Sequence, residues 1–317
     1  MQSLINISKF VILAVLSFSL IITWNSNNTQ FASAGFTNTD ENASVQSVDS
    51  VWNSMSRDFH LTQYAQPDQV QAEIRKLLAN PDQLYHILQS AAPYIYFIHQ
   101  QTEARGLPAE IALIPFVESE FNPNDRSTKG ATGLWQLMSG TAHELGVKVK
   151  TGYDGRRNVV ASTKAALAYF KDLGNNFKGN WYLAIAAYDC GPMKIESAER
   201  RTGSHSFWNL PLPRETKYYV PKLLAVAAII KNPEKYGVQL PPINNQPYFA
   251  ALKVAKPVNL SQLAQSSGVS VATLHTLNPD YNHSKAPAGN STHLLLVPVN
   301  KVSAVTAQLP AAQVTNT

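Results

Sequence analysis

A single carboxylate beside an apolar helical face is the first candidate for chemistry in this sequence. Pro108 marks a position where a helix can begin, because the first helical residue needs no backbone donor. Ile111, Ile114 and Glu118 then recur at intervals of three and four residues, so Glu118 shares a face with apolar residues that point into the protein. Burial raises the pKa of a carboxyl group, which suits a general acid near neutral pH. Glu118 is therefore a candidate general acid, with an ordinary helix-end glutamate paired to a lysine as the alternative.

The residues after Glu118 indicate a binding cleft. Turn residues at 122–124 end the helix, and a loop punctuated by Gly130 and Gly133 leads to an aromatic residue beside an amide, Trp135 and Gln136. Aromatic faces and planar amides are the groups that hold sugars, so this stretch predicts a carbohydrate cleft. Trp135 has a core position as its alternative interpretation. For Trp181, further along the chain, a core position is the favoured interpretation.

The composition describes an exported protein that folds on its own hydrophobic core. The chain has 317 residues, with 26 Lys and Arg against 21 Asp and Glu, a net charge of +5. This mild excess suits an anionic wall or membrane surface and is too scattered to indicate a nucleic-acid partner. Cys190 is the sole cysteine, so the chain cannot form an internal disulfide.

The N-terminus has the pattern of a signal peptide. Lys9 precedes an apolar run over 10–22, and Ala32-Ser33-Ala34 matches an A-x-A cleavage site. The run is shorter than the span of about 20 residues that crosses a membrane. We expect residues 1–34 to be cleaved after Ala34 and the protein to reach the periplasm or cell envelope. The alternative is an uncleaved N-terminal segment that associates with the membrane.

Helical periodicity dominates the chain up to a proline-rich boundary at 240–245. We expect a linker at 35–50, an N-terminal helical extension at 51–105 and a helical domain at 106–238. The expected helices cover 70–78, 84–98 with a kink at Pro93, the Glu118 segment, 139–145, 160–173, 181–190 and 216–230. Beyond the boundary we expect a β-α-α-β module at 245–300, with strands at 248–254 and 293–297 and helices at 260–266 and 271–277, followed by a loose tail at 301–317.

Four motifs in a fixed order resemble those of the lytic murein transglycosylases with a goose-lysozyme-like (SLT) catalytic domain. They are Glu118-Ser119-Glu120-Phe121, the loop at 130–136, Ala187-Tyr188-Asp189, and Glu215-Thr216 with Tyr219-Val220. The resemblance is closest to the membrane-bound D branch, which has a Val-Trp segment ahead of the catalytic domain, as at Val51-Trp52. It implies a mainly α fold, in which a lysozyme-like helical domain carries an N-terminal helical extension and a small C-terminal module.

The resemblance also implies a reaction. Glu118 would be the single general acid/base that cleaves the β-1,4 bond between N-acetylmuramic acid and N-acetylglucosamine without water, leaving 1,6-anhydro ends. The protein would be a carbon–oxygen lyase that acts on peptidoglycan glycan strands as a monomer, without cofactor or metal. The positions that bind or orient the sugar fall on Ser119, Gln136, Met138, Tyr188, Asp189, Glu215 and Tyr219.

Asp189 departs from the family, which has asparagine at this position. A second carboxylate near Glu118 raises a pKa by repulsion and predicts a tuned or slowed transglycosylase. Two alternatives stay open: a peptidoglycan-binding protein with impaired catalysis, and an inverting muramidase that uses Asp189 as its second carboxylate. Cys190 lacks a partnering histidine motif for a nucleophile, and His143 lacks the second histidine of a zinc-protease helix.

The C-terminal module resembles a degenerate LysM module of the kind that binds N-acetylglucosamine glycans. Support comes from Gly268-Val269-Ser270, from Leu277-Asn278-Pro279 and from the closing apolar strand. The segment 255–258 stands where LysM modules have a glycine-aspartate turn. Glycan binding and a purely structural role are therefore both open for residues 245–300.

Overall fold

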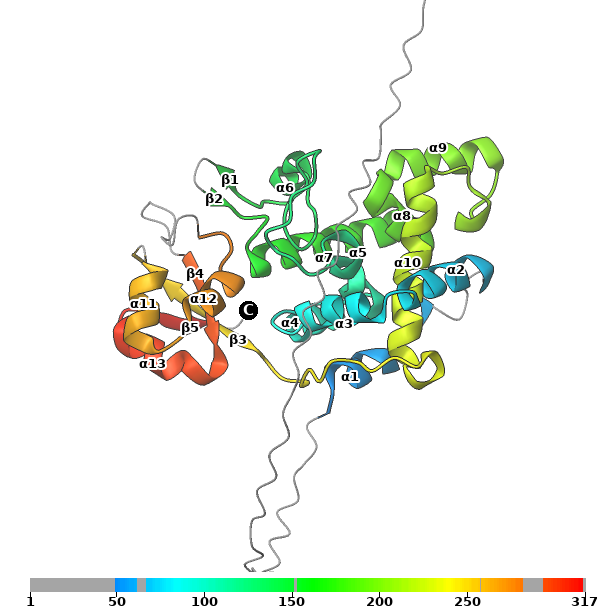
Figure 1. Ribbon diagram of the computed structural model, residues 1–317. Helices are drawn as coiled ribbons and strands as arrows, with labels where there is room; N and C mark the ends of the chain where they lie inside the picture. Colours follow the sequence, from blue (N-terminus) through cyan, green and yellow to red (C-terminus); the bar gives the residue numbers. More distant parts are fainter. Residues whose placement is uncertain (1–48, 62–66, 151–152, 257, 282–292, 316–317) are drawn as a thin grey trace, which may run out of the picture. The chain divides into compact units, whose positions relative to one another are not determined.

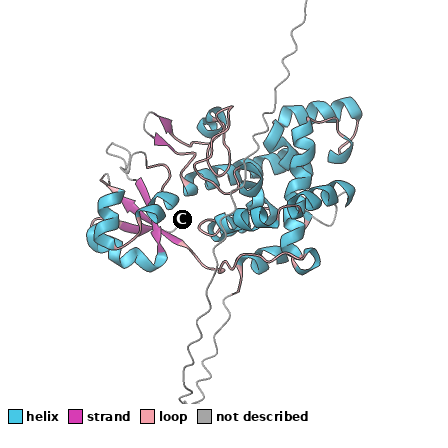
Figure 2. Ribbon diagram, in the orientation of Figure 1, coloured by secondary structure: helices cyan, strands magenta, loops and turns pink. Residues whose placement is uncertain are grey.

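The helical part of the protein is built around two apolar helices. The computed structural model describes residues 49–61, 67–150, 153–256, 258–281 and 293–315 (Figure 1). Its helices up to residue 236 are α1 (Val51–Arg57), α2 (Pro67–Leu78), α3 (Pro81–Ser90), α4 (Ile95–Glu103), η2 (Ala109–Leu113), α5 (Ile114–Glu118), α6 (Ser139–Glu144), α7 (Val159–Asn176), α8 (Trp181–Cys190), α9 (Pro192–Thr202), η3 (Phe207–Asn209), α10 (Arg214–Lys231) and η4 (Glu234–Tyr236). A short ribbon of β1 (Val149–Lys150) and β2 (Tyr153–Asp154) lies between α6 and α7 (Figure 2).

Helices α8 and α10 form the centre of this part. Residues 183–187 of α8 are all buried, as expected for a helix that is apolar on every side. Helix α10 contacts α1, α2, α5 and α8, and buries Leu223 and Leu224 completely. Burying one leucine side chain stabilises a fold by roughly 1.5–3 kcal/mol, so this helix holds the others in place.

The predicted helices at 70–78, 139–145, 160–173, 181–190 and 216–230 are confirmed with small changes of boundary. The single kinked helix at 84–98 is wrong. Helix α3 ends at Ser90 and α4 begins at Ile95, because Pro93 has no backbone N–H to donate and disfavours a helical residue before it. The Glu118 segment is likewise split into the 3-10 helix η2 and a single turn of α-helix.

The Val-Trp segment at 51–52 is part of the core. Trp52 is 1% exposed, and its indole Nε1 donates a hydrogen bond to the carbonyl of Pro241 at 2.9 Å. Ser50 pairs with Asn244 as an isolated antiparallel bridge. The start of the described chain is thereby held against the proline-rich segment that follows the helical domain.

The C-terminal module contains one antiparallel sheet and three helices. Its elements are β3 (Phe249–Val254), α11 (Leu260–Ser267), α12 (Val271–Leu277), β4 (His293–Pro298), α13 (Val302–Gln308) and β5 (Gln313–Thr315), with the 3-10 turn η6 (Val299–Lys301) before α13. The strand order is β4-β3-β5, with Phe249 opposite Pro298 and Ala251 opposite Thr315. Asn278 replaces a strand neighbour for β4, because its side chain donates to the carbonyl of Leu296 and accepts from the same residue's N–H, at 2.8 and 2.7 Å.

The prediction of a loose tail at 301–317 is wrong for the residues that the structure describes. Val305 of α13 is fully buried among the apolar residues of the module, and β5 pairs with β3. Without β5, one edge of β3 would expose unpaired backbone groups. The tail lacks strong periodicity because α13 and β5 are short and each buries few side chains.

The predicted signal peptide at 1–34 and nearly all of the linker at 35–50 lie outside the described residues. Within the described part of the chain, no helix has both the length and the apolar character needed to cross a membrane.

Candidate active site

The backbone reverses direction immediately after Glu118. Glu118 is the last residue of α5, and after Ser119 the next two residues, Glu120 and Phe121, have φ angles of 52° and 58°. Left-handed backbone costs a residue with a side chain roughly 1 kcal/mol, and such strain gathers at functional sites. The turn is fixed by Phe121, which is 1% exposed and whose N–H bonds to the carbonyl of Pro115 at 3.1 Å.

A tyrosine from the far end of the sequence holds the Glu118 carboxyl. Tyr219 lies in the second turn of α10, and its hydroxyl donates a hydrogen bond to Glu118 Oε1 at 2.5 Å. Burial raises the pKa of Glu118 from its ordinary 4.5 to about 8, although the Tyr219 hydrogen bond acts in the opposite direction. Asp189 and Glu215 raise this pKa further, and Lys222 lowers it. Glu118 is therefore mostly protonated at neutral pH and able to donate a proton.

Ser119 connects Glu118 to the loop at 130–136, which we call the glycine loop. It is 6% exposed, and its hydroxyl donates to the carbonyl of Leu134 at 2.9 Å. Tyr188 of α8 does the same for the next residue, because its hydroxyl donates to the carbonyl of Trp135 at 2.7 Å. The Tyr188 ring stacks on Phe170 with centroids 4.4 Å apart. The residue that follows α5 and a residue of α8 thus hold two consecutive carbonyls of the loop, those of Leu134 and Trp135.

A buried arginine also holds the glycine loop, by hydrogen bonds to one carbonyl of the loop and to that of the residue after it. Arg156 is 4% exposed, and its Nη1 donates to the carbonyls of Gly130 and Leu137 at 2.8 and 3.0 Å. Asp154 pairs with the same guanidinium at 2.7 Å. The loop approaches Arg156 so closely that a Cβ on Gly133 would lie 2.1 Å from the Arg156 carbonyl oxygen.

Trp135 belongs to the core and is not a sugar platform. Its side chain is fully buried, and its indole Nε1 donates to Thr163 Oγ1 at 3.0 Å. Gln136 has a φ angle of 45°, and its amide nitrogen donates to the carbonyls of Gly133 and Asp125 at 2.9 and 3.3 Å. Of the predicted aromatic-amide pair, only Gln136 reaches the cavity that contains Glu118.

That cavity has a volume of about 860 Å³ and gathers residues from α5, α8, α10 and the glycine loop. It is lined by all of the predicted site residues except Ser119: Glu118, Gln136, Met138, Tyr188, Asp189, Glu215 and Tyr219. Burial raises the pKa of Asp189, and the negative charge of Glu215 adds to this effect. The volume is within the range of small-molecule and oligosaccharide clefts.

Two family models match the chain. Residues 95–211 match the model "Transglycosylase SLT domain", and residues 248–314 match "Lytic transglycosylase MltD, LysM-like domain". A curated protein from Alteromonas sp. (strain M-1), with a name that refers to tributyltin chloride resistance, is 36% identical over 178 residues, which are 55% of this chain and 84% of that protein. Membrane-bound lytic murein transglycosylase D from Escherichia coli (strain K12) is 38% identical over 233 residues, or 72% of this chain. The chain belongs to the SLT-domain lytic transglycosylase family.

The chain spans about half the length of this relative, because the matched part makes up 52% of the Escherichia coli protein. Among solved structures, the lytic transglycosylase Slt from Pseudomonas aeruginosa is 25% identical and matches 61% of this chain and 33% of its own, with a TM-score of 0.39. The SLT match confirms the predicted mainly helical, lysozyme-like fold, and the LysM-like match extends past residue 300 to include α13 and β5.

The cavity around Glu118, called the SLT cavity below, also has lining residues that the sequence did not single out. Lys222 lies one turn after Tyr219 on α10, and Lys129 and Tyr169 are further lining residues. The spacing of Tyr219 and Lys222 at i and i+3 was the available signal, because such residues share a helix face. In the described part of the chain, no group of three or more His, Cys, Asp or Glu side chains is arranged to hold a metal ion.

Proposed function

We propose that this family member is an exported lytic transglycosylase that cleaves peptidoglycan glycan strands with Glu118 as its single general acid/base. The observation that carries the proposal is the pKa of Glu118, raised to about 8 in a cavity that α5, α8, α10 and the glycine loop enclose. A carboxyl group with this pKa is a proton donor at neutral pH and becomes a base after it has given up the proton.

The reaction needs one carboxyl group in two successive roles. Glu118 first protonates the glycosidic oxygen that leaves from C1 of the muramic acid. The resulting carboxylate then accepts the proton of the C6 hydroxyl while that oxygen bonds to C1, which closes the 1,6-anhydro ring. No water enters, so the second carboxylate that an inverting glycosidase uses to activate water is unnecessary. Tyr219, hydrogen-bonded to Glu118 Oε1, stabilises the carboxylate between the two steps.

Asp189 fits this reaction better than it fits hydrolysis. An inverting hydrolase uses its second carboxylate to activate water. Here the negative charge of Asp189 raises the pKa of Glu118 and so favours the protonated acid that starts the transglycosylase reaction. We infer that Asp189 tunes the transglycosylase without redirecting it to water.

Mass spectrometry of the products released from purified sacculi tests the proposal. We expect muropeptides with 1,6-anhydro ends, which contain one water fewer than hydrolysis products. Reducing ends would instead support the muramidase, and retained binding to sacculi without soluble product would support an impaired binding protein. Either of these outcomes contradicts the proposed function.

The Tyr219 hydroxyl should control the pH range of activity. Tyr219→Phe removes the hydrogen bond that favours the charged form of Glu118, so the pKa of Glu118 should rise further above its value of about 8. Because the acid must be protonated, the alkaline limb of the kcat/KM profile should move upward by about one pH unit. The turbidity loss of sacculi between pH 5 and about 10 measures this shift.

Tyr218→Phe is the matched control, because Tyr218 precedes Tyr219 on α10 and is 46% exposed. Its profile should follow that of the unaltered protein. An alkaline limb that stays in place for Tyr219→Phe would contradict the assignment of the limb to Glu118.

We further propose that the protein works in the periplasm or cell envelope as a monomer, with the LysM-like module contributing to glycan binding. The signal-peptide pattern at 1–34 and the family match at 248–314 support this proposal. Binding of the full chain to sacculi, before and after removal of residues from 248 onward, tests the contribution of the module.

A further inference from the structure

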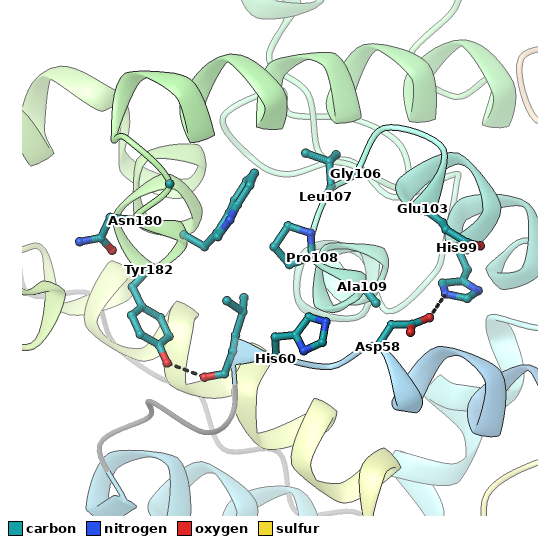
Figure 3. A pocket seen from close by; sticks show the side chains of 13 residues that line it. Asp58, His60, His99, Glu103, Gly106, Leu107, Pro108, Ala109, Asn180 and Tyr182 are labelled. Carbon is teal, nitrogen blue, oxygen red and sulfur yellow. Dashed lines mark hydrogen bonds and ion pairs between the residues drawn. The ribbon is translucent and has the colours of Figure 1, made fainter.

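A second cavity, separate from the SLT cavity, lies between the end of α1, helix α4 and the start of α8 (Figure 3). Its volume is about 700 Å³, and it shares no lining residue with the cavity around Glu118. The polar lining residues are Asp58, His60, His99, Glu103, Asn180 and Tyr182. The catalytic proposal leaves this cavity without a role.

His99 is buried in the wall of this cavity without a hydrogen-bond partner. Its side chain is 2% exposed, and neither Nδ1 nor Nε2 makes a hydrogen bond within the described structure. Leaving a buried polar group unpaired costs about 1–3 kcal/mol, so such groups indicate a missing partner. Burial lowers the pKa of His99 and so favours the neutral imidazole, in which one nitrogen can accept a hydrogen bond.

Two carboxylates flank this imidazole. Asp58 Oδ2 lies 4.0 Å from His99 Nε2, beyond hydrogen-bond distance, and Figure 3 shows the two groups facing each other. Glu103 lies one helical turn after His99 on α4, and its charge also acts on the imidazole. Glu103 Oε2 itself accepts a hydrogen bond from Gln100 at 3.3 Å. Two carboxylates and the imidazole therefore line the same end of the cavity, with Asp58 and His99 as the pair that face each other.

The charge of the lining favours a cation. It contains two carboxylates and neither lysine nor arginine. The lysines bonded to nearby backbone, Lys231 to the carbonyl of Phe59 and Lys171 to that of Arg105, do not line it. The two carboxylates would repel an anionic ligand.

We propose that this cavity binds a primary ammonium group at the end of an aliphatic chain, with Asp58 and His99 accepting two of its N–H bonds and the charge of Glu103 adding to the attraction. An ammonium has three donors and no acceptor. Two acceptors at about 2.8 Å from one tetrahedral nitrogen lie about 4.6 Å apart, close to the separation observed between Asp58 and His99. Leu107, Pro108 and Trp181 form an apolar wall along which the methylene chain can pack.

Two kinds of molecule present this group: a free diamine, and the amino side chain of a peptide. Isothermal titration calorimetry of the full chain with 1,5-diaminopentane and with Nα-acetyl-lysine methylamide separates them. Binding of both shows that the amine is sufficient. Binding of the lysine derivative alone assigns the site to a peptide-borne amine.

Nα-acetyl-norleucine methylamide is the control ligand, because it keeps the aliphatic chain and lacks the amine. It should show no measurable binding. Equal binding of this compound, or binding of an N-acetylglucosamine oligomer in place of the amines, would overturn the proposal. Absence of binding by either amine would also overturn it.

Asp58→Asn and Glu103→Gln should each weaken amine binding by about tenfold, because each removes one negative charge that attracts the ammonium. Both side chains are exposed enough for these variants to fold, and neither lines the catalytic cavity, so lysis of sacculi should be unchanged. Asp82→Asn, an exposed carboxylate of α3 outside this cavity, is the matched control. The ring-nitrogen NMR signals of His99 should shift with amine in the unaltered protein, and unchanged signals would contradict the assigned contact.

Discussion

Glu118→Gln is expected to reduce the release of soluble products from sacculi by a factor of about 10² to 10⁴, the usual contribution of general acid/base catalysis. The amide keeps the shape of the side chain and can still bond to the Tyr219 hydroxyl, but it cannot give up or accept the proton that the reaction moves. The rate of release of anhydromuropeptides, measured by chromatography and mass spectrometry, gives the factor directly.

Glu120→Gln provides the control for this experiment. Glu120 is also a glutamate, lies two residues after Glu118 and is exposed, so the same substitution there removes the same charge. Its activity should remain near that of the unaltered protein. Near-normal lysis by Glu118→Gln would remove Glu118 from the mechanism.

The Glu118→Gln variant should be more stable than the unaltered protein in neutral to mildly alkaline solution. The folded-state pKa of Glu118, about 8, lies above its ordinary value of 4.5, so ionisation destabilises the fold progressively as the pH rises through that window. Glutamine does not ionise and escapes this cost. A thermal unfolding midpoint above that of the unaltered protein at pH 8, with no gain at pH 4, would separate lost chemistry from lost structure.

Gly133→Ala is expected to lower the free energy of unfolding by about 3 kcal/mol or more. Gly133 has a φ angle of +87°, which costs alanine roughly 1 kcal/mol, and the new Cβ would lie 2.1 Å from the carbonyl oxygen of Arg156. The obstacle is the backbone of Arg156 rather than the end of a flexible side chain, so the loop has to move. Urea unfolding monitored by circular dichroism measures the loss.

Gly130→Ala separates the two causes. Gly130 has nearly the same φ angle, +88°, but a Cβ there would have open space around it. Its cost should be limited to about 1 kcal/mol. Equal losses for the two variants would contradict the role assigned to the close approach at Arg156.

Periodic segments were predictable from the sequence because one face of each is buried along its whole length. Helix α8 has the predicted boundaries, and Ile111 and Ile114 are fully buried as their spacing indicated. The split at Pro93, the short helix α13 and strand β5 were missed because each depends on a few local contacts. No repeating pattern marks such contacts in the sequence.

The candidate site was only partly accessible to sequence reasoning from the residues themselves. The spacing around Glu118 predicted a buried acid, but Tyr219 comes from a helix a hundred residues away, and only family resemblance connected the two. The sequence left Trp135 open between a sugar platform and a core position, because an indole beside an amide is equally typical of either. Its hydrogen bond to Thr163 decides between these interpretations.

The two consecutive carbonyls held by Ser119 and Tyr188 have a consequence for the entropy of binding. Fixing the backbone of one residue costs about 1–2 kcal/mol, and here that cost falls on folding rather than on substrate capture. The backbone beside the cavity is therefore already ordered before a ligand binds. Under the proposed function, rigid or already extended glycan strands should consequently bind better than flexible ones.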